Sequence, residues 1–187
     1  MDNLNGAETI KATEYILPHK SYTINELIRY MIVDSDNNAT AILLKNIEPK
    51  ILESIYGDLG VELPTDPTDY ISAKTYSLFF RILYRSTYLT RDMSEKAMKL
   101  LSESEFNDGL KAGVPAGIKL AHKFGEYEGR DNSGSVTKEL HDCGVVYYPK
   151  HPYMLCVMTK GSDLGNLKEV IKNISQTVYT EIKNQYK

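Results

Sequence analysis

The first part of the chain alternates helical patterns with polar interruptions. Apolar residues recur at helical spacing after Thr23-Ile24-Asn25-Glu26, which has the pattern of a capping box. Five polar residues at 34–38 interrupt this spacing, and it resumes over 39–48. A short third helix is expected at 49–56, because Gly57 follows it. The pattern thus predicts two amphipathic helices joined by a polar turn, followed by a shorter helix.

Two more helices are predicted before the pattern changes. Residues 61–70 hold two prolines among acidic residues and are expected to form a loop. Ser72 and Thr90 each precede an apolar stripe at helical spacing, so both are candidate N-caps. The glycine- and proline-rich stretch 109–117 then connects these helices to the rest of the chain.

From about residue 118 the pattern becomes typical of strands. Residues 118–124 are predicted to form one strand, and 126–138 a polar, glycine-containing loop. Residues 140–148 and 153–159 are predicted to form a hairpin, after which Gly161 ends the sheet. A last helix from Asp163 is expected to bury one stripe, made of Leu164, Leu167, Ile171, Ile174, Val178 and Ile182.

Helices first and strands later favour an α+β fold with an antiparallel sheet. The expected organisation is an irregular lead-in over 1–21, a helical subdomain over 22–117 and a strand-rich part with a closing helix over 118–187. We expect the three parts to form one structural unit.

Composition narrows the function classes. The net charge of −3 and the absence of a basic stripe argue against nucleic acid as a partner. No apolar run reaches the ~20 residues of a membrane span. The first five residues are polar and acidic, so they do not resemble a secretory signal.

The two cysteines, Cys143 and Cys156, are too few for the disulfide framework of a small secreted domain. If Tyr148 faces Tyr153 across the hairpin turn, the two cysteines share a face with a diagonal offset, and we expect two buried free thiols. The compact sequence His141-Asp142-Cys143 is unsuited to a metal clip, because strand neighbours point to opposite faces. We expect no metal and no cofactor.

The polar turn contains Ser35-Asp36-Asn37, between two predicted helices. A serine in such a turn can point into a cleft and relay a proton, as acyl transfer requires. Asn37 carries both a donor and an acceptor with which to orient a lysine and a substrate amide, while Asp36 can cap the following helix. By itself the tripeptide is better explained as an N-cap rich in Asp and Asn.

The second candidate motif is Lys123-Phe124-Gly125, late in the predicted strand 118–124. Lys123 can hold a substrate carboxylate and favour the deprotonated form of Ser35. Gly125 permits close approach of a substrate to the backbone, and the N–H of Glu126 can donate to an oxyanion. The structural alternative is an edge-strand lysine that opposes aggregation.

Together these tripeptides resemble the second and third motifs of the penicillin-recognising serine enzymes, the class A β-lactamase and penicillin-binding-protein group. The resemblance extends to the flanking sequences at 22–28, 38–40, 120–122 and 142–149, and it covers about 22–187. It implies a β-lactamase/transpeptidase-like fold whose sheet is reduced to about three strands. It also implies catalytic roles for Ser35, Asn37 and Lys123, substrate contacts at Gly125 and Glu126, and an extracytoplasmic location for the intact protein.

The chain departs from this family pattern in three ways. No Ser-x-x-Lys motif precedes Ser35, and Ser135-Val136-Thr137-Lys138 matches it only within a predicted loop. The loop 61–70 has three acidic residues but lacks the Glu-x-x-x-Asn arrangement of class A enzymes. Phe124 stands where the family has a threonine or serine hydroxyl.

The leading interpretation is a fragment of a β-lactamase-like serine hydrolase, acting on a β-lactam, peptide or ester and inactive alone because its nucleophile is absent. A missing N-terminal segment, or a second copy, is expected to pair with the exposed edge of strand 153–159. One alternative is a non-catalytic module on the same fold that binds cell-wall peptide or a protein. Another is an unrelated α+β interaction domain, in which Ser35 and Lys123 lie far apart.

Overall fold

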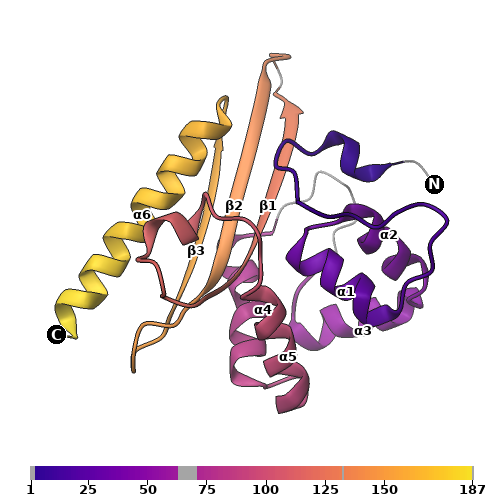
Figure 1. The fold of residues 1–187 in the computed structure, drawn as a ribbon, viewed down its shortest axis with the longest axis horizontal. Helices are drawn as coiled ribbons and strands as arrows, with labels where there is room; N and C mark the ends of the chain where they lie inside the picture. Colours follow the sequence, from indigo (N-terminus) through magenta and orange to yellow (C-terminus); the bar gives the residue numbers. More distant parts are fainter. Residues whose placement is uncertain (1–2, 63–70, 132, 187) are drawn as a thin grey trace.

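A three-stranded antiparallel sheet forms the centre of the computed structural model, which describes residues 3–62, 71–131 and 133–186 (Figure 1). The strands are β1 (Leu120–Arg130), β2 (Val136–Val146) and β3 (Tyr153–Gly161), in the order β1-β2-β3. The long helix α6 (Leu164–Gln185) follows β3 and packs beside it. The α+β prediction with a three-stranded sheet and a closing helix is confirmed.

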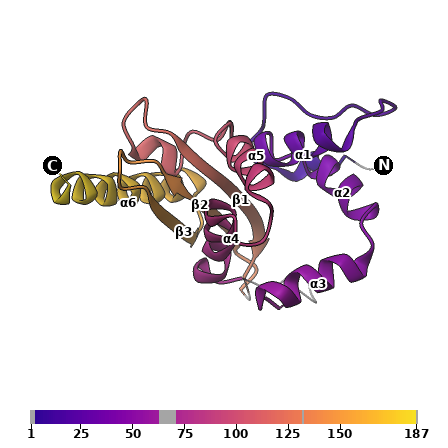
Figure 2. The same ribbon diagram turned by 90° about the horizontal axis from the view of Figure 1, so that it is seen from below.

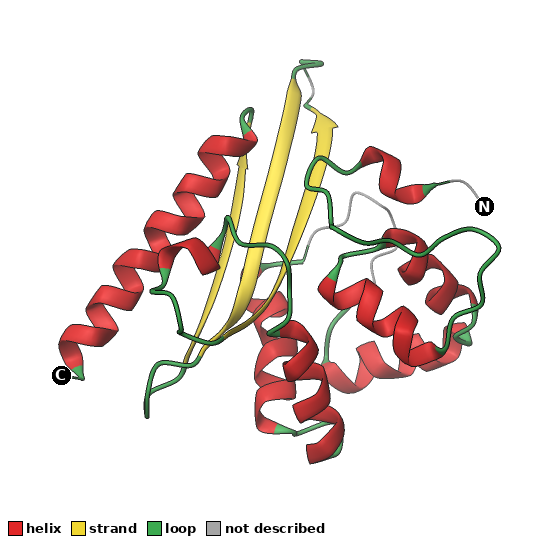
Figure 3. Cartoon of the chain, viewed as in Figure 1, coloured by secondary structure: helices red, strands yellow, loops and turns green. Residues whose placement is uncertain are grey.

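The helical part precedes the sheet in the chain (Figure 1), and Figure 3 distinguishes the helices from the strands by colour. Its α-helices are α1 (Ile24–Val33), α2 (Asn37–Lys45), α3 (Pro49–Leu59), α4 (Ala73–Arg85) and α5 (Arg91–Leu101), and two 3-10 turns are η1 (Leu4–Ala7) and η2 (Leu110–Gly113). The predicted caps are confirmed: Thr23 forms a capping box with Glu26, and the side chains of Ser72 and Thr90 accept hydrogen bonds from the first turns of α4 and α5. Among the described residues, no helix is both long and apolar enough to cross a bilayer.

Alternation along the strands gives the sheet two different apolar faces. On one face Phe124, Leu140 and Val157 join Leu167 and Ile171 of α6 in one core. On the other face a second core contains Phe80 of α4, Met98 and Leu101 of α5, and residues Ala121, Cys143 and Val145 of the sheet. The sheet therefore lies between α6 and the pair α4–α5, while α1, α2 and α3 extend to one side (Figure 2). Any two neighbours in β1 consequently face different halves of the molecule.

Several predicted boundaries were wrong. The expected loop 126–138 instead continues the hairpin, because β1 extends to Arg130 and β2 starts at Val136. Its polar residues belong to exposed ends of strands, where hydrophobic alternation is weak. Helix α3 continues past Gly57 and ends at Gly60, whose left-handed φ of 64° suits a C-cap. The lead-in, expected to be irregular, contains η1.

The apolar stripe of α6 is also narrower than predicted. Leu167 and Ile171 are buried, but Ile174 is 38% exposed and the next buried position is Ser175. Ser175 donates to the carbonyl oxygen of Leu110 at 2.8 Å, so the helix is anchored there by a hydrogen bond to η2 instead of an apolar contact. The exposed Ile174 and Val170 lie on a face of α6 that the described chain leaves open to solvent.

The prediction of two free thiols was wrong, because Cys143 and Cys156 form a disulfide. The expected register placed Tyr148 opposite Tyr153, whereas Val146 lies opposite Tyr153. This two-residue difference puts Cys143 directly opposite Cys156. The disulfide joins β2 to the edge strand β3 within the core that faces α4.

We predict that replacing both cysteines by serine lowers the free energy of unfolding by about 2–3 kcal/mol, because the bridge closes a short loop in the unfolded chain. Urea denaturation of the oxidised wild type and the double variant measures the difference. Wild type with a reducing agent is the matched control and should approach the variant. Equal unfolding midpoints for all three samples would contradict the prediction.

Candidate active site

The turn between α1 and α2 presents Ser35. Asp34 ends α1, and Asp36 caps α2 by accepting the Ala39 N–H at 2.9 Å. Between them Ser35 has a φ of 55°, in the left-handed region that non-glycine residues seldom occupy. The turn is fixed by a hydrogen bond from the Asp36 N–H to the Tyr30 carbonyl oxygen at 3.0 Å. Backbone strain at Ser35 is therefore maintained by the two helices that flank it.

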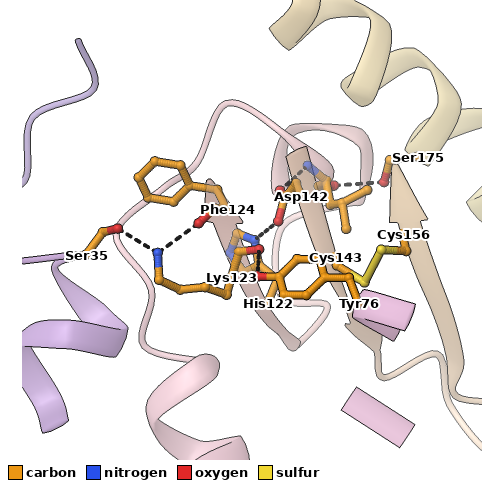
Figure 4. Close-up of polar contacts among 10 residues, drawn as sticks. Ser35, Tyr76, His122, Lys123, Phe124, Asp142, Cys143, Cys156 and Ser175 are labelled. Carbon is orange, nitrogen blue, oxygen red and sulfur yellow. Dashed lines mark hydrogen bonds and ion pairs between the residues drawn. A yellow bond between two sulfur atoms is a disulfide. The ribbon is translucent and has the colours of Figure 1, made fainter. Parts of the chain in front are cut away.

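Lys123 reaches Ser35 from β1 (Figure 4). Its Nζ lies 2.6 Å from Ser35 Oγ and also donates to the Phe124 carbonyl oxygen at 2.8 Å. Ser35 and Lys123 are separated by 88 residues, so the tertiary structure creates this contact. It excludes the interpretation in which the two motifs match by accident and lie far apart.

Burial changes the acid–base character of Lys123. Removal from water lowers the pKa of its ammonium group to about 8, although the negative charges of Asp142 and Glu8 oppose this shift. The neutral amine is therefore accessible near neutral pH, where an exposed lysine stays protonated. A neutral Nζ beside a hydroxyl can accept its proton, and the charged form can hold an anion.

Asp36 forms hydrogen bonds that hold the lead-in, residues 1–21, against the turn between α1 and α2. Its carboxylate is completely buried and accepts hydrogen bonds from Asn5 Nδ2 at 3.1 Å and from the Ile16 N–H at 2.7 Å. The Asn37 N–H donates in turn to Asn5 Oδ1 at 2.8 Å. A buried carboxylate with several donors stays satisfied without a counter-ion. The lead-in is thus ordered by the motif, although its sequence has no period.

Asn37 and Glu126 both bind the lead-in segment 8–10. Asn37 Nδ2 donates to Glu8 Oε1 at 2.6 Å, and burial raises the pKa of Glu8. Glu126 Oε1 accepts the N–H groups of Thr9 and Ile10 at 2.7 and 2.8 Å. Two of the residues that the sequence placed in the site therefore hold the segment 8–10.

Contacts from both faces of the sheet hold β1 in place around Lys123. Nδ1 of the buried His122 lies 2.9 Å from Asp142 Oδ1, and Asp142 Oδ2 accepts the Leu110 N–H at 2.9 Å. Tyr76 donates its hydroxyl to the Lys123 carbonyl oxygen at 3.3 Å, and burial raises the Tyr76 pKa so that it remains a donor. These contacts fix the backbone of β1 where Lys123 leaves it (Figure 4).

The remaining candidates are placed as follows. Gly125 has open space where a side chain would stand, with no atom within 4 Å of an added Cβ.

Ser135 lies in the hairpin turn and Val136 begins β2, so the matching Ser-x-x-Lys is not on a helix. Of the acidic residues expected in the loop 61–70, only Glu62 belongs to the described part of the chain. Within that part, no three His, Cys, Asp or Glu side chains converge as metal ligands.

Sequence reasoning missed Glu8, His122 and Asp142. The role of Glu8 could not be predicted from its neighbours, because the hydrophobic residues around it do not recur at helix or strand spacing. His122 and Asp142 are detectable only with the correct register, in which Phe124 lies opposite Asp142 and His122 becomes its diagonal neighbour.

Comparison with known proteins gives the same fold. PBP-A superposes with a TM-score of 0.71 at 19% identity, over 90% of this chain and 64% of PBP-A. A penicillin G acyl-enzyme complex of a PBP-A mutant gives a TM-score of 0.72 at 20% identity, over 90% of this chain and 65% of that one. A representative of class A β-lactamase from Bacteroides cellulosilyticus superposes with a TM-score of 0.76 at 20% identity, over 89% of this chain and 67% of that one. No curated protein sequence matches the chain significantly.

This chain thus spans somewhat less than two thirds of the length of PBP-A. The profile described as the "Beta-lactamase enzyme family" matches residues 2–182, almost the whole sequence. The shared fold, the paired Ser35 and Lys123 and this match lead to one conclusion: the chain belongs to the β-lactamase enzyme family.

Proposed function

We propose that this chain supplies the Ser-Asp-Asn and Lys-Phe-Gly parts of an acyl-serine hydrolase site. The observation that carries the proposal is the 2.6 Å contact between Ser35 Oγ and Lys123 Nζ. The substrate class is a β-lactam, a cell-wall-type peptide or an ester, each of which presents a carbonyl to a serine. We place the intact protein outside the cytoplasm in this proposal, which the family resemblance supports.

Each site residue has a distinct part in this proposal. Ser35 relays a proton between the attacking group and the leaving atom, with Lys123 as the base or acid beside it. Asn37 orients the substrate amide, and the charged form of Lys123 holds a substrate carboxylate. The N–H of Glu126, next to the open space at Gly125, is the proposed oxyanion donor.

The attacking serine of the family lies in a Ser-x-x-Lys motif on a helix. The match at 135–138 does not meet this requirement, because residues three apart in an extended strand point to opposite faces. We therefore propose that the nucleophile belongs to a segment outside these 187 residues. By this proposal the chain is catalytically incomplete when alone.

The same proposal assigns a place for that segment. β3 is an edge strand of the sheet and Met154 on it is 39% exposed, while Val170 and Ile174 are exposed on α6, the helix that packs beside β3. An open strand edge beside apolar side chains favours addition of another strand. An N-terminal segment or a second copy of the chain would cover this edge.

We predict that fluorescent penicillin labels the chain only when it is extended by the residues encoded upstream of Met1. In that extended protein, Ser35→Ala should lower the acylation rate by about 10²-fold or more, because proton transfer loses its relay. The control Ser135→Ala should leave the rate unchanged. Label on the 187-residue chain alone would show that its own nucleophile suffices, and no label on either protein would favour a non-catalytic peptide- or protein-binding module.

We predict that Lys123 titrates with a midpoint near 8 in the folded chain, because burial disfavours its charge. Since the unfolded chain binds this proton more readily, Lys123 destabilises the fold below pH 8, and that penalty disappears as the pH rises toward about 10.4. NMR of the lysine Cε carbon and urea unfolding measure both effects. Lys123→Met should lack this rise in stability, and a titration midpoint near 10 would contradict the assignment.

We also predict that the isolated chain self-associates through β3, because its edge is open and apolar. Sedimentation at increasing protein concentration should show a dimer. Replacing Met154 by lysine should weaken association, while Val136→Lys, at a similarly exposed position near the hairpin turn, is the matched control. A strictly monomeric chain at high concentration would argue against an accessible docking edge.

A further inference from the structure

Glu8 and Asn37 form a short contact at the rim of the candidate active site. Asn37 Nδ2 donates to Glu8 Oε1 at 2.6 Å, and the two residues are 29 positions apart in the chain. Both side chains line a cavity of about 210 Å³, whose wall also includes Thr9 and Glu126. Asn37 is exposed, so a ligand in this cavity can reach its amide group.

The carboxylate of Glu8 dictates how the amide group of Asn37 is turned. An ionised carboxylate only accepts hydrogen bonds, whereas the side chain of an asparagine carries an acceptor at one end and donors at the other. The NH2 group of Asn37 must therefore face Glu8, and its Oδ1 must point elsewhere. No described residue donates a hydrogen bond to this Oδ1, so the oxygen is available to a ligand.

Both ends of this contact are held in place by other hydrogen bonds. Glu126 binds the backbone N–H groups of the two residues that follow Glu8. Tyr15 donates its hydroxyl to Glu8 Oε2 at 3.1 Å. At the other end, the backbone N–H of Asn37 donates to Asn5 Oδ1 at 2.8 Å. Because neither partner is free to move away, Glu8 can keep the amide of Asn37 in one orientation.

We propose that Glu8 is a positioning residue, which turns the Asn37 side chain so that its Oδ1 accepts an N–H group of the substrate. This inference rests on the proposed function, in which Asn37 orients the substrate, and it narrows the substrate class. An acyl compound with an amide N–H satisfies the acceptor, whereas the corresponding ester presents a second acceptor to it. Peptide-like acyl compounds are therefore preferred to esters.

The surroundings of Glu8 contain charges of both signs. The groups that face it come from the lead-in, from the turn before α2 and from β1, and they are Lys11, Tyr15, Asp36, Lys123 and Glu126. Three further charged residues line the same cavity and are compensated elsewhere: Glu128 pairs with Lys138, and Glu139 pairs with Lys160. The protonation of Glu8 is thus governed by the first group.

Burial raises the pKa of Glu8 above the usual value of a glutamate. The hydroxyl of Tyr15 and the charge of Lys11 oppose this shift, while Glu126 and Asp36 reinforce it. As the pH falls through the raised pKa, Glu8 gains a proton and becomes able to donate, so it no longer holds the amide of Asn37 in one orientation. Acidification should therefore release Asn37.

The first test follows the side-chain NH2 resonances of Asn37 in the 187-residue chain by proton–nitrogen NMR, from about pH 4 to 7. We expect these resonances to shift with a midpoint above the usual 4.5 of a glutamate. Glu8→Gln should abolish the shift, because a glutamine does not titrate. Glu14→Gln, which removes an exposed glutamate of the same lead-in, is the matched control and should keep it.

A second variant keeps the test decisive if Glu8→Gln does not fold. Tyr15→Phe leaves the carboxylate in place and removes the hydroxyl that lowers the pKa of Glu8. The midpoint of the Asn37 shift should therefore move to a higher pH in this variant. A structural role of Glu8 alone gives no reason for the Asn37 resonances to follow Tyr15.

The second test compares N-acetylglycine with acetoxyacetate, in which an ester oxygen replaces the N–H. Dissociation constants for the 187-residue chain are measured from saturable backbone amide shifts. We expect N-acetylglycine to bind about fivefold more tightly, which corresponds to one hydrogen bond. Glu8→Gln should bring the ratio of the two constants to about one, because the amide of Asn37 can then turn either way. Glu14→Gln should preserve the preference.

Asn37 resonances that do not respond to pH, or that still titrate in Glu8→Gln, would overturn the positioning role. Equal dissociation constants in the wild type, or no saturable binding of either compound, would overturn the assignment of Oδ1 to a substrate N–H. If both tests succeed and the chain extended by its upstream residues still forms no acyl-serine, the proposed function fails and the role of Glu8 stands. Acyl-serine formation without titration of Asn37 would do the reverse.

Discussion

The hydrogen bond between Ser35 and Lys123 depends on side-chain alternation along β1. Because neighbours in a strand face opposite sides, Lys123 points toward the helical half that holds Ser35, while His122 and Phe124 point toward α6. A register shift of one residue would exchange these roles and place an aromatic ring at the serine. The His122–Asp142–Leu110 contacts, which hold β1 against β2 and η2, therefore protect the position of the lysine from the opposite face.

Buried carboxylates bind the segments of this molecule that lie outside the α-helices and the sheet. Asp36 binds the lead-in through Asn5 and Ile16, and Asp142 binds η2 through Leu110. In both cases backbone or amide N–H groups provide the compensation that burial of a negative charge requires. Asp34 is the exception, because one of its oxygens remains unpaired within the described chain. Its other oxygen accepts a hydrogen bond from Arg29, so the charge of this buried carboxylate is offset by a cation.

Lys123 is a cation in surroundings that are otherwise acidic. Glu8 and Asp142 lie close enough to raise the pKa of Lys123, and Asp34 lies beside Ser35, yet burial still lowers the pKa to about 8. The site can therefore offer a neutral amine for proton transfer and an ammonium group for an anion within a narrow pH range. Both forms suit acyl transfer, in which a proton moves while charge develops on oxygen. The fold shared with PBP-A accommodates this arrangement although this chain spans only 64% of that protein.

The sequence alone determined the helix caps, the polar turn that carries Ser35, the α+β order of elements and the two motifs of the site. These features are encoded locally, in the spacing of apolar residues and in short polar signatures such as Thr23 and Glu26. The sequence did not determine the hairpin register, because register depends on packing against both faces of the sheet. The disulfide and the His122–Asp142 pair both follow from the register, so the sequence did not predict them either. Only the tertiary structure decided that Glu8 meets Asn37 and that Asp36 binds Asn5 and Ile16, since these contacts join segments with no local pattern to connect them.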